Sequence, residues 1–220
     1  MMTLTTCGRK VLMKVKKLLN SALNFLNVHP DKNQRWILLS LFVSGLLITY
    51  VHPAIVKEVY TNLPAEWIAF ESLASSVAGL VVGMLWKGSV RKGVTKNFLL
   101  FAISESVLGC LLGFFLAFIY YNVWIFAVAS LVYSAFITTF VGKCIMAFKS
   151  RLWIEREREI YDNNQSVIAG IVCVIGFSLA LIAMPSLKLA LVLWGLCCII
   201  DDIGWIIVYI KNHEALKTIE

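Results

Sequence analysis

The 220-residue sequence has little charge and little proline. Only 15% of its residues are charged and four are proline, whereas 60% are hydrophobic. Soluble domains carry charge on about a quarter of their residues, so an ordinary soluble fold is excluded. The sequence also lacks the alternating segments of about 10 residues that indicate an outer-membrane barrel.

Residue types that carry chemistry are sparse as well. The three His residues lie in loops or at the ends of apolar runs, and the six Cys residues show no C-x-x-C spacing. A metal cluster or a disulfide framework is therefore not expected. The motifs G-x-S-x-G and H-E-x-x-H and the phosphate-binding loop are absent. We expect no enzyme activity, no cofactor and no metal.

Long apolar runs dominate what remains. About 20 apolar residues cross a bilayer as a helix. The sequence predicts an all-α integral membrane protein with six transmembrane helices. The predicted spans are Trp36–Tyr50 (extending toward Val56, with Pro53 as a kink), Glu66–Trp86, Asn97–Tyr120, Val123–Phe148, Ser166–Met184 and Leu187–Ile210. Residues 31–212 form this domain, Lys149–Gln165 is its longest polar loop, and residues 213–220 form a polar tail.

The amino-terminal segment 1–30 precedes the first span. Its apolar residues recur at helical spacing between Val11 and Leu26, and basic residues occupy much of the rest. This pattern predicts a basic amphipathic helix on an anionic leaflet, with a partly ordered basic tail as the alternative. The residues that would contact the leaflet are Arg9, Lys10, Lys14, Lys16 and Lys17. The net charge of +7 fits basic cytoplasmic segments, and we expect no nucleic-acid partner.

Orientation follows from the short polar stretch Gly83–Lys96, which carries four basic residues and no acid. Basic loops stay in the cytoplasm. With this stretch inside, only Lys57 and Lys188 of the twenty Lys and Arg residues fall outside. The sequence therefore predicts a multi-pass protein of the cell membrane with both termini in the cytoplasm.

Small residues recur every four positions on three spans, which allows helix backbones to approach closely in lipid. The three seams are Glu71, Ser75, Gly79 and Gly83; Glu105, Gly109, Gly113 and Ala117; and Ser130, Ser134, Thr138 and Gly142. Packing within one bundle is one interpretation. A homodimer contact along the second span is the other.

Four ionisable residues count to similar depths on three predicted spans. They are Glu105, Lys143, Asp201 and Asp202. A charge at membrane depth costs roughly 3 kcal/mol on insertion scales, so such groups face the protein interior or water. They could form a buried ion-pair lock or a proton- or cation-coupled relay. In a third interpretation some of them, Lys143 most readily, extend to the interface.

One loop resembles a known family. Gly83, Leu85, Arg91 and Lys92 fall on the pattern G-x-L-x-D-x-x-G-R-K of major facilitator superfamily transporters, with Lys87 in place of the Asp and Val90 in place of the Gly. The charged stretch 153–158, followed by Asn164, Ala169 and Gly170, resembles the family's connection between its fourth and fifth helices. Residues 31–212 look like the amino-terminal half of such a transporter.

The resemblance implies two inverted three-helix repeats and a second half supplied by a second copy or a membrane partner. It also implies a cavity for a small solute lined by Ser40, Ser44, Thr49, Tyr133 and Thr138. The missing motif Asp puts the contact between halves in doubt. Glu105 and Asp201 would lie on peripheral helices of the family, which favours the lock.

Transport, or a transport-derived role, is therefore the expected function. A non-transporting membrane protein with a half-transporter fold, such as an immunity, regulatory or assembly factor, is the first alternative. The second is the substrate-binding subunit of an energy-coupling vitamin transporter. That subunit needs small residues on its first helix, for which Ser40 and Ser44 are a weak match.

Overall fold

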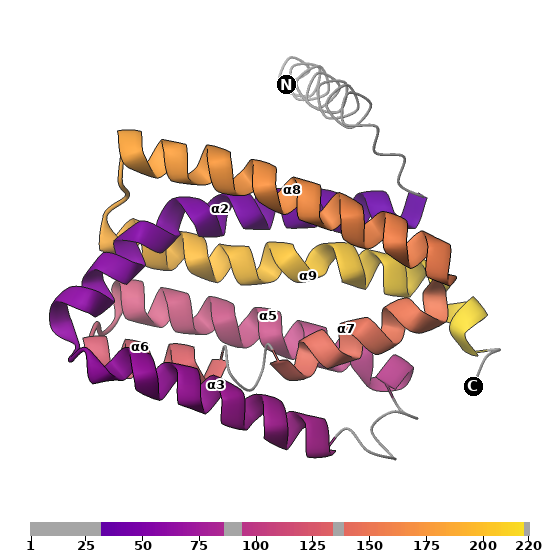
Figure 1. The fold of residues 1–220 in the computed structure, drawn as a ribbon, viewed down its shortest axis with the longest axis horizontal. Coiled ribbons are helices and arrows are strands. Elements are labelled where there is room, and N and C mark those ends of the chain that lie inside the picture. The colour runs from indigo at the N-terminus through magenta and orange to yellow at the C-terminus, as the bar shows by residue number, and fades with distance from the viewer. Residues whose placement is uncertain (1–31, 86–93, 134–138, 218–220) are drawn as a thin grey trace, which may run out of the picture.

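The structure, a computed structural model, describes residues 32–85, 94–133 and 139–217, and within them every regular element is a helix (Figure 1). The helices are α2 (Lys32–Asn62), α3 (Glu66–Leu85), α5 (Val94–Phe118), α6 (Val123–Val132), α7 (Thr139–Leu152), α8 (Glu155–Ile182) and α9 (Leu187–Lys217). Four of them, α2, α5, α8 and α9, are long and apolar enough to cross a membrane. The all-helical class is thus confirmed within the described residues, and four helices that could cross a membrane are compatible with a multi-pass protein.

The carboxy-terminal helix α9 occupies the middle of the bundle. It packs between α2 and α5, and α8 packs on α2. Figure 1 shows α8, α2, α9 and α5 side by side, with α3, α6 and α7 on the α5 side. Contacts of Ser44 with Asp201 and of Ser106 with Asp202 fix the register of α9 against its two neighbours.

Aromatic rings close the end of the bundle where α2, α5 and α8 begin and α7 and α9 end. The rings of Phe98 and Phe148 stack with centroids 4.8 Å apart, and those of Trp153 and Tyr161 lie 5.0 Å apart. Trp205 joins the two pairs through edge contacts. Aromatic pairs add about 0.5–1.5 kcal/mol each beyond the area they bury. This cluster therefore ties four helices, α5, α7, α8 and α9, together at one end.

The opposite end is fixed by polar contacts. Asn122 Oδ1 accepts from the backbone N–H groups of Trp124 and Ile125, which starts α6 at the predicted residue. Tyr121 donates a 3.0 Å hydrogen bond to Glu58 Oε1 near the end of α2. Burial, with a smaller contribution from Glu58, raises the pKa of Tyr121 above its ordinary value, so the hydroxyl keeps its proton and remains a donor.

Three predicted boundaries differ from the structure. The segment predicted as the Lys149–Gln165 loop is mostly helix, broken only at Trp153 and Ile154. The backbone N–H of Ile154 donates to Glu157 Oε2, which caps α8 and allows it to start eleven residues before the predicted span. Helix α2 continues through Pro53 to Asn62, and α9 continues into the predicted tail.

The remaining spans are shorter in the structure. The apolar part of α3 is Ala69–Met84, and α6 contributes Val123–Val132 to the predicted fourth span. Residues 134–138, between α6 and α7, lie outside the described residues, as does the whole amino-terminal segment. Six spans and inverted repeats therefore stay predictions.

Candidate functional site

Asp202 joins α9 to α5. It is 4% exposed, and its Oδ2 accepts a 2.6 Å hydrogen bond from the hydroxyl of Ser106, which is 6% exposed. Ser106 also contacts the Ala102 carbonyl one turn earlier, at 3.0 Å. Glu105, the neighbour of Ser106, is buried too, and its carbonyl accepts from the hydroxyl of Tyr133 at 3.4 Å. A carboxylate buried at membrane depth requires such donors, because each unpaired polar group in hydrocarbon costs several kcal/mol.

Asp201 joins α9 to α2 instead. Ser44, which is 2% exposed, donates to Asp201 Oδ1 at 2.7 Å. One turn earlier on α2, Ser40 donates to the backbone carbonyls of Ile200 and Asp201. The two adjacent acids are therefore divided between two interfaces. We call Asp201 and Asp202 the α9 acid pair.

Glycine allows the helices to come this close. A Cβ on Gly204 would lie 2.7 Å from Ile37 Cα, and one on Gly109 would lie 2.6 Å from Cys198 Sγ. Such distances are shorter than carbon atoms tolerate, so a larger residue at either position would separate the helices. The third-span seam of Glu105, Gly109 and Gly113 thus packs within the bundle, against α9.

Lys143 does not complete the predicted layer. Its side chain is exposed, whereas Glu105 and Asp202 are buried, and no ion pair joins it to the α9 acid pair within the described residues. Lys143 and the three acids count to similar depths along their helices. Depth does not fix the direction in which a helix residue faces, so Lys143 can point away from the acids. The ion pair that the structure does form nearby is Lys149–Asp162, 2.9 Å long, at the α7–α8 break.

The residues expected to line a cavity instead contact neighbouring helices. Ser40 and Ser44 bond to α9, and Thr49 donates to the Val172 carbonyl of α8 at 3.0 Å. Tyr133 contacts α5, as described above, and Thr138 lies outside the described residues. Hydroxyl contacts of this kind hold membrane helices together.

The second-span seam faces outward. Glu71, Ser75, Gly79 and Gly83 are all exposed, and a Cβ on either glycine would meet no atom within 4 Å. In the fourth-span seam Gly142 is equally open, Ser130 is half-buried, and Ser134 and Thr138 lie outside the described residues. Of the motif loop the structure describes Gly83 and the helix end at Leu85, whereas Arg91 and Lys92 lie outside the described residues.

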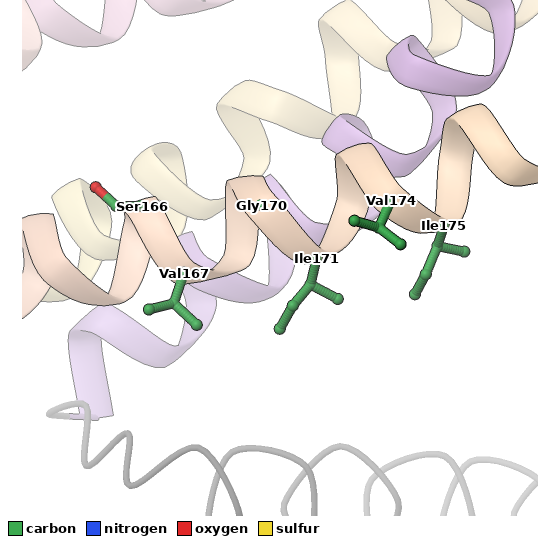
Figure 2. A pocket seen from close by; sticks show the side chains of 6 residues that line it. All are labelled: Ser166, Val167, Gly170, Ile171, Val174 and Ile175. Carbon is green, nitrogen blue, oxygen red and sulfur yellow. The ribbon is translucent and has the colours of Figure 1, made fainter.

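Two shallow grooves lie on the outer faces of the bundle. One, of about 380 Å³, follows α8 along Ser166, Val167, Gly170, Ile171, Val174 and Ile175. Figure 2 shows its Val and Ile side chains projecting from one face of that helix. The other, of about 220 Å³, lies between α2 and α9 beside Trp36, Ser40 and Ile203. Both are open and apolar, as surfaces in contact with lipid are.

Sequence reasoning missed two polar residues of the site. Ser106 was overlooked because it does not belong to the four-residue seam of Glu105, although a lone hydroxyl in an apolar run is a signal of helix–helix contact. Asn164 was noted only for the family resemblance, yet it is 4% exposed and its Nδ2 has no hydrogen-bond partner within the described residues. Among those residues no three His, Cys, Asp or Glu side chains gather as metal ligands would.

Comparisons with family models, with curated proteins and with solved structures found no match for this chain.

Proposed function

We propose that the protein moves a small solute across a membrane as a half-transporter unit that works as a pair of copies. The observation that carries this proposal is the open seam on α3. Its small residues Ser75, Gly79 and Gly83 form an exposed stripe beside an exposed acid, Glu71, and among the described residues a Cβ on either glycine would meet no atom within 4 Å.

The α3 seam is open, whereas the seam of the same spacing on α5 is filled by another helix. The α5 seam has the same spacing, and its glycines are filled by α9, so that a Cβ on Gly113 would lie 2.7 Å from the Leu191 carbonyl. Helices in lipid associate through such close backbone contact rather than through the hydrophobic effect. An unfilled seam on α3 therefore favours a second copy as the missing contact, and the solute path would then lie between the two copies.

The pairing is tested by cross-linking in nanodiscs, in a background in which Cys7 and the exposed Cys173 are replaced by Ser. We expect Gly79→Cys to form a cross-linked dimer. Leu80→Cys is the matched control, because Leu80 lies at the same depth, 57% exposed, on a different side of α3. Equal cross-linking of both variants, or of neither, would reject pairing through this seam.

Transport itself is tested in proteoliposomes with a panel of radiolabelled amino acids, sugars and small organic ions. Uptake of at least one solute should require the chain and should fall in Gly79→Leu, which fills the seam. Uptake unchanged by Gly79→Leu would show that a single copy suffices. Uptake of no solute by the chain would favour the second candidate below.

A non-transporting regulatory or assembly protein is that second candidate. It is favoured by one specific observation: Ser40, Ser44 and Thr49, which a transporter of the resembled family would place in its cavity, bond to neighbouring helices. In that case the open α3 seam would bind a different membrane protein rather than a second copy.

A further inference from the structure

The two residues of the α9 acid pair are adjacent in sequence but differ in how far the protein covers them. Asp202 is buried, whereas Asp201 keeps an exposed surface although protein surrounds most of its carboxyl group. Yet the residues one turn before and after Asp201 on its own face of α9, Cys197, Cys198, Gly204 and Trp205, are all buried. On a helix, positions three and four residues away share a face. Part of Asp201 is therefore left uncovered by protein within the otherwise buried face of α9.

A second, independent polar group lies at the same level. Gln34 donates to the Glu157 carbonyl and Thr49 donates to the Val172 carbonyl, and both pairs are 123 residues apart in sequence. Because the sequence separation is the same for both pairs, α2 and α8 run parallel. The same separation of 123 residues places Asn164 opposite Leu41, which is one turn from Ser44. Asn164 Nδ2 is a buried donor with no partner within the described residues. Tyr161, one turn before Asn164, contacts the ring of Trp205, one turn after Asp201, with centroids 5.9 Å apart, so Asn164 and Asp201 lie at a similar level on their two helices. A water that holds such a donor needs an acceptor nearby, and the Asp201 carboxylate is the acceptor that we infer.

We propose that Asp201 is a proton-exchange site, reached by water that is held between Asp201 and Asn164, whereas Asp202 is a fixed contact between α5 and α9. On loading, a hydronium ion gives its proton to Asp201 Oδ2, the oxygen that Ser44 does not contact: an O–H bond of the hydronium breaks, an O–H bond forms at the carboxyl, and water remains. The carboxyl is then neutral, and release returns the proton to water. This inference deepens the proposed function, on which it rests for its physiological meaning, by naming the proton as the coupling ion.

The chemistry favours a proton over a metal cation. A metal ion in oxygen coordination takes about six ligands, and this level offers one free carboxylate oxygen, a hydroxyl and an amide. A proton needs only the oxygen and a route to water. Because a charge at membrane depth costs roughly 3 kcal/mol, the neutral form is the one compatible with movement of the bundle.

The groups that face this site are known for each neighbouring helix. Helix α2 contributes the hydroxyls of Ser40 and Ser44. The titratable groups close enough to interact with Asp201 or with its partner Asp202 are Tyr161 on α8, Glu105 on α5, Tyr133 after α6, and Cys197 and Cys198 on α9. All of these are acids or neutral groups in the physiological pH range. Lys143, on α7, is exposed.

The test is infrared difference spectroscopy of the full chain in nanodiscs between acid and alkaline pH. A protonated carboxyl has a carbonyl stretch that disappears on ionisation and shifts in D₂O. We expect one such band to be lost in Asp201→Asn. We also expect Ser44→Ala to move the midpoint of that band upward by about one to two pH units, because the ionised form loses a charge-assisted hydrogen bond.

Ser106→Ala is the matched control, because Ser106 donates its hydrogen bond to Asp202. Its loss should leave the pH midpoint of the Asp201 band unchanged. The proposal would be overturned if neither Asp201→Asn nor Ser44→Ala changed any carboxyl band. It would also be overturned if Ser106→Ala shifted the midpoint of the band and Ser44→Ala did not. If Asp201→Asn does not fold, the comparison of the two Ser variants decides alone. The measurement needs neither a transported solute nor a second copy, so its failure is separate from failure of the proposed function.

Discussion

Ser106 on α5 and Asp202 on α9 are joined by a 2.6 Å hydrogen bond in which neither side chain is more than 6% exposed. The two helices thus share a polar contact inside an otherwise apolar interface. An acceptor left unsatisfied in such a place costs about 1–3 kcal/mol.

We expect Ser106→Ala to lower the free energy of unfolding in detergent by about 1–3 kcal/mol for that reason. Ser104→Ala is the control, because Ser104 bonds to the Leu100 carbonyl of its own helix. Its loss should change stability by less than about 0.5 kcal/mol. Equal effects of the two substitutions would mean that the α5–α9 contact contributes nothing specific.

The α5 glycines should tolerate no side chain. Gly113→Ala places a methyl group 2.7 Å from the Leu191 carbonyl, a backbone atom that cannot move aside cheaply, and we expect a loss of about 1–3 kcal/mol. Gly142→Ala meets nothing within 4 Å and should gain about 0.5–1 kcal/mol, because Ala is the better helix former. Thermal unfolding in detergent measures both. Stabilisation by Gly113→Ala would contradict the close α5–α9 contact.

The predicted orientation can be tested by cysteine labelling of intact cells, in a background in which Cys7 and the exposed Cys173 are replaced by Ser. An impermeant reagent applied outside should modify Asn62→Cys or Asn122→Cys, at the ends of α2 and α6. It should not modify Ser89→Cys or Asn163→Cys, which the charge asymmetry places inside. Modification of Ser89→Cys from outside would reverse the topology.

Lys143 should be energetically independent of the acid pair. A buried lock would make Lys143→Met cost roughly 3–5 kcal/mol and would make Asp201→Asn partly restore the loss. Because Lys143 is exposed, we expect instead a coupling energy below about 0.5 kcal/mol in a double-mutant cycle. The cycle is read from thermal unfolding, and a coupling of about 2 kcal/mol or more, in the upper part of the roughly 0.5–3 kcal/mol range that contacting residues show, would restore the lock.

The sequence was sufficient for the class of fold and for some helix ends, such as the starts of α3, α6 and α9. Apolar run lengths predict the helices, and Asn122 marks the start of α6 as a cap residue should. The extension of α8 to Glu155 was missed because a charged helix that leaves the bilayer has the composition of a loop, and only its cap at Ile154 reveals it.

The sequence indicates which ionisable residues lie in apolar helices, but not the direction in which each one faces. Asp201, Asp202 and Glu105 stand out because charge in an apolar run is conspicuous, and their depth in a membrane stays a prediction. Whether each acid meets α2, α5 or open space depends on how α9 is rotated, and that rotation follows from glycine contacts such as Gly204 with Ile37. One sequence does not specify which of several small-residue seams is filled, so the α3 and α5 seams looked alike.

Pro53 interrupts α2 without ending it, and this has a mechanical consequence. Proline has no N–H, so the hydrogen bond from residue 53 to the Thr49 carbonyl is missing. Before this point α2 is held to α8 through Thr49 and Val172, and after it Ala54 and Ile55 pack with the first turns of α9. The missing hydrogen bond therefore makes this turn the place where α2 is easiest to bend. Bending there would shift the last turns of α2 against the first turns of α9 while the Ser44–Asp201 contact stays in place.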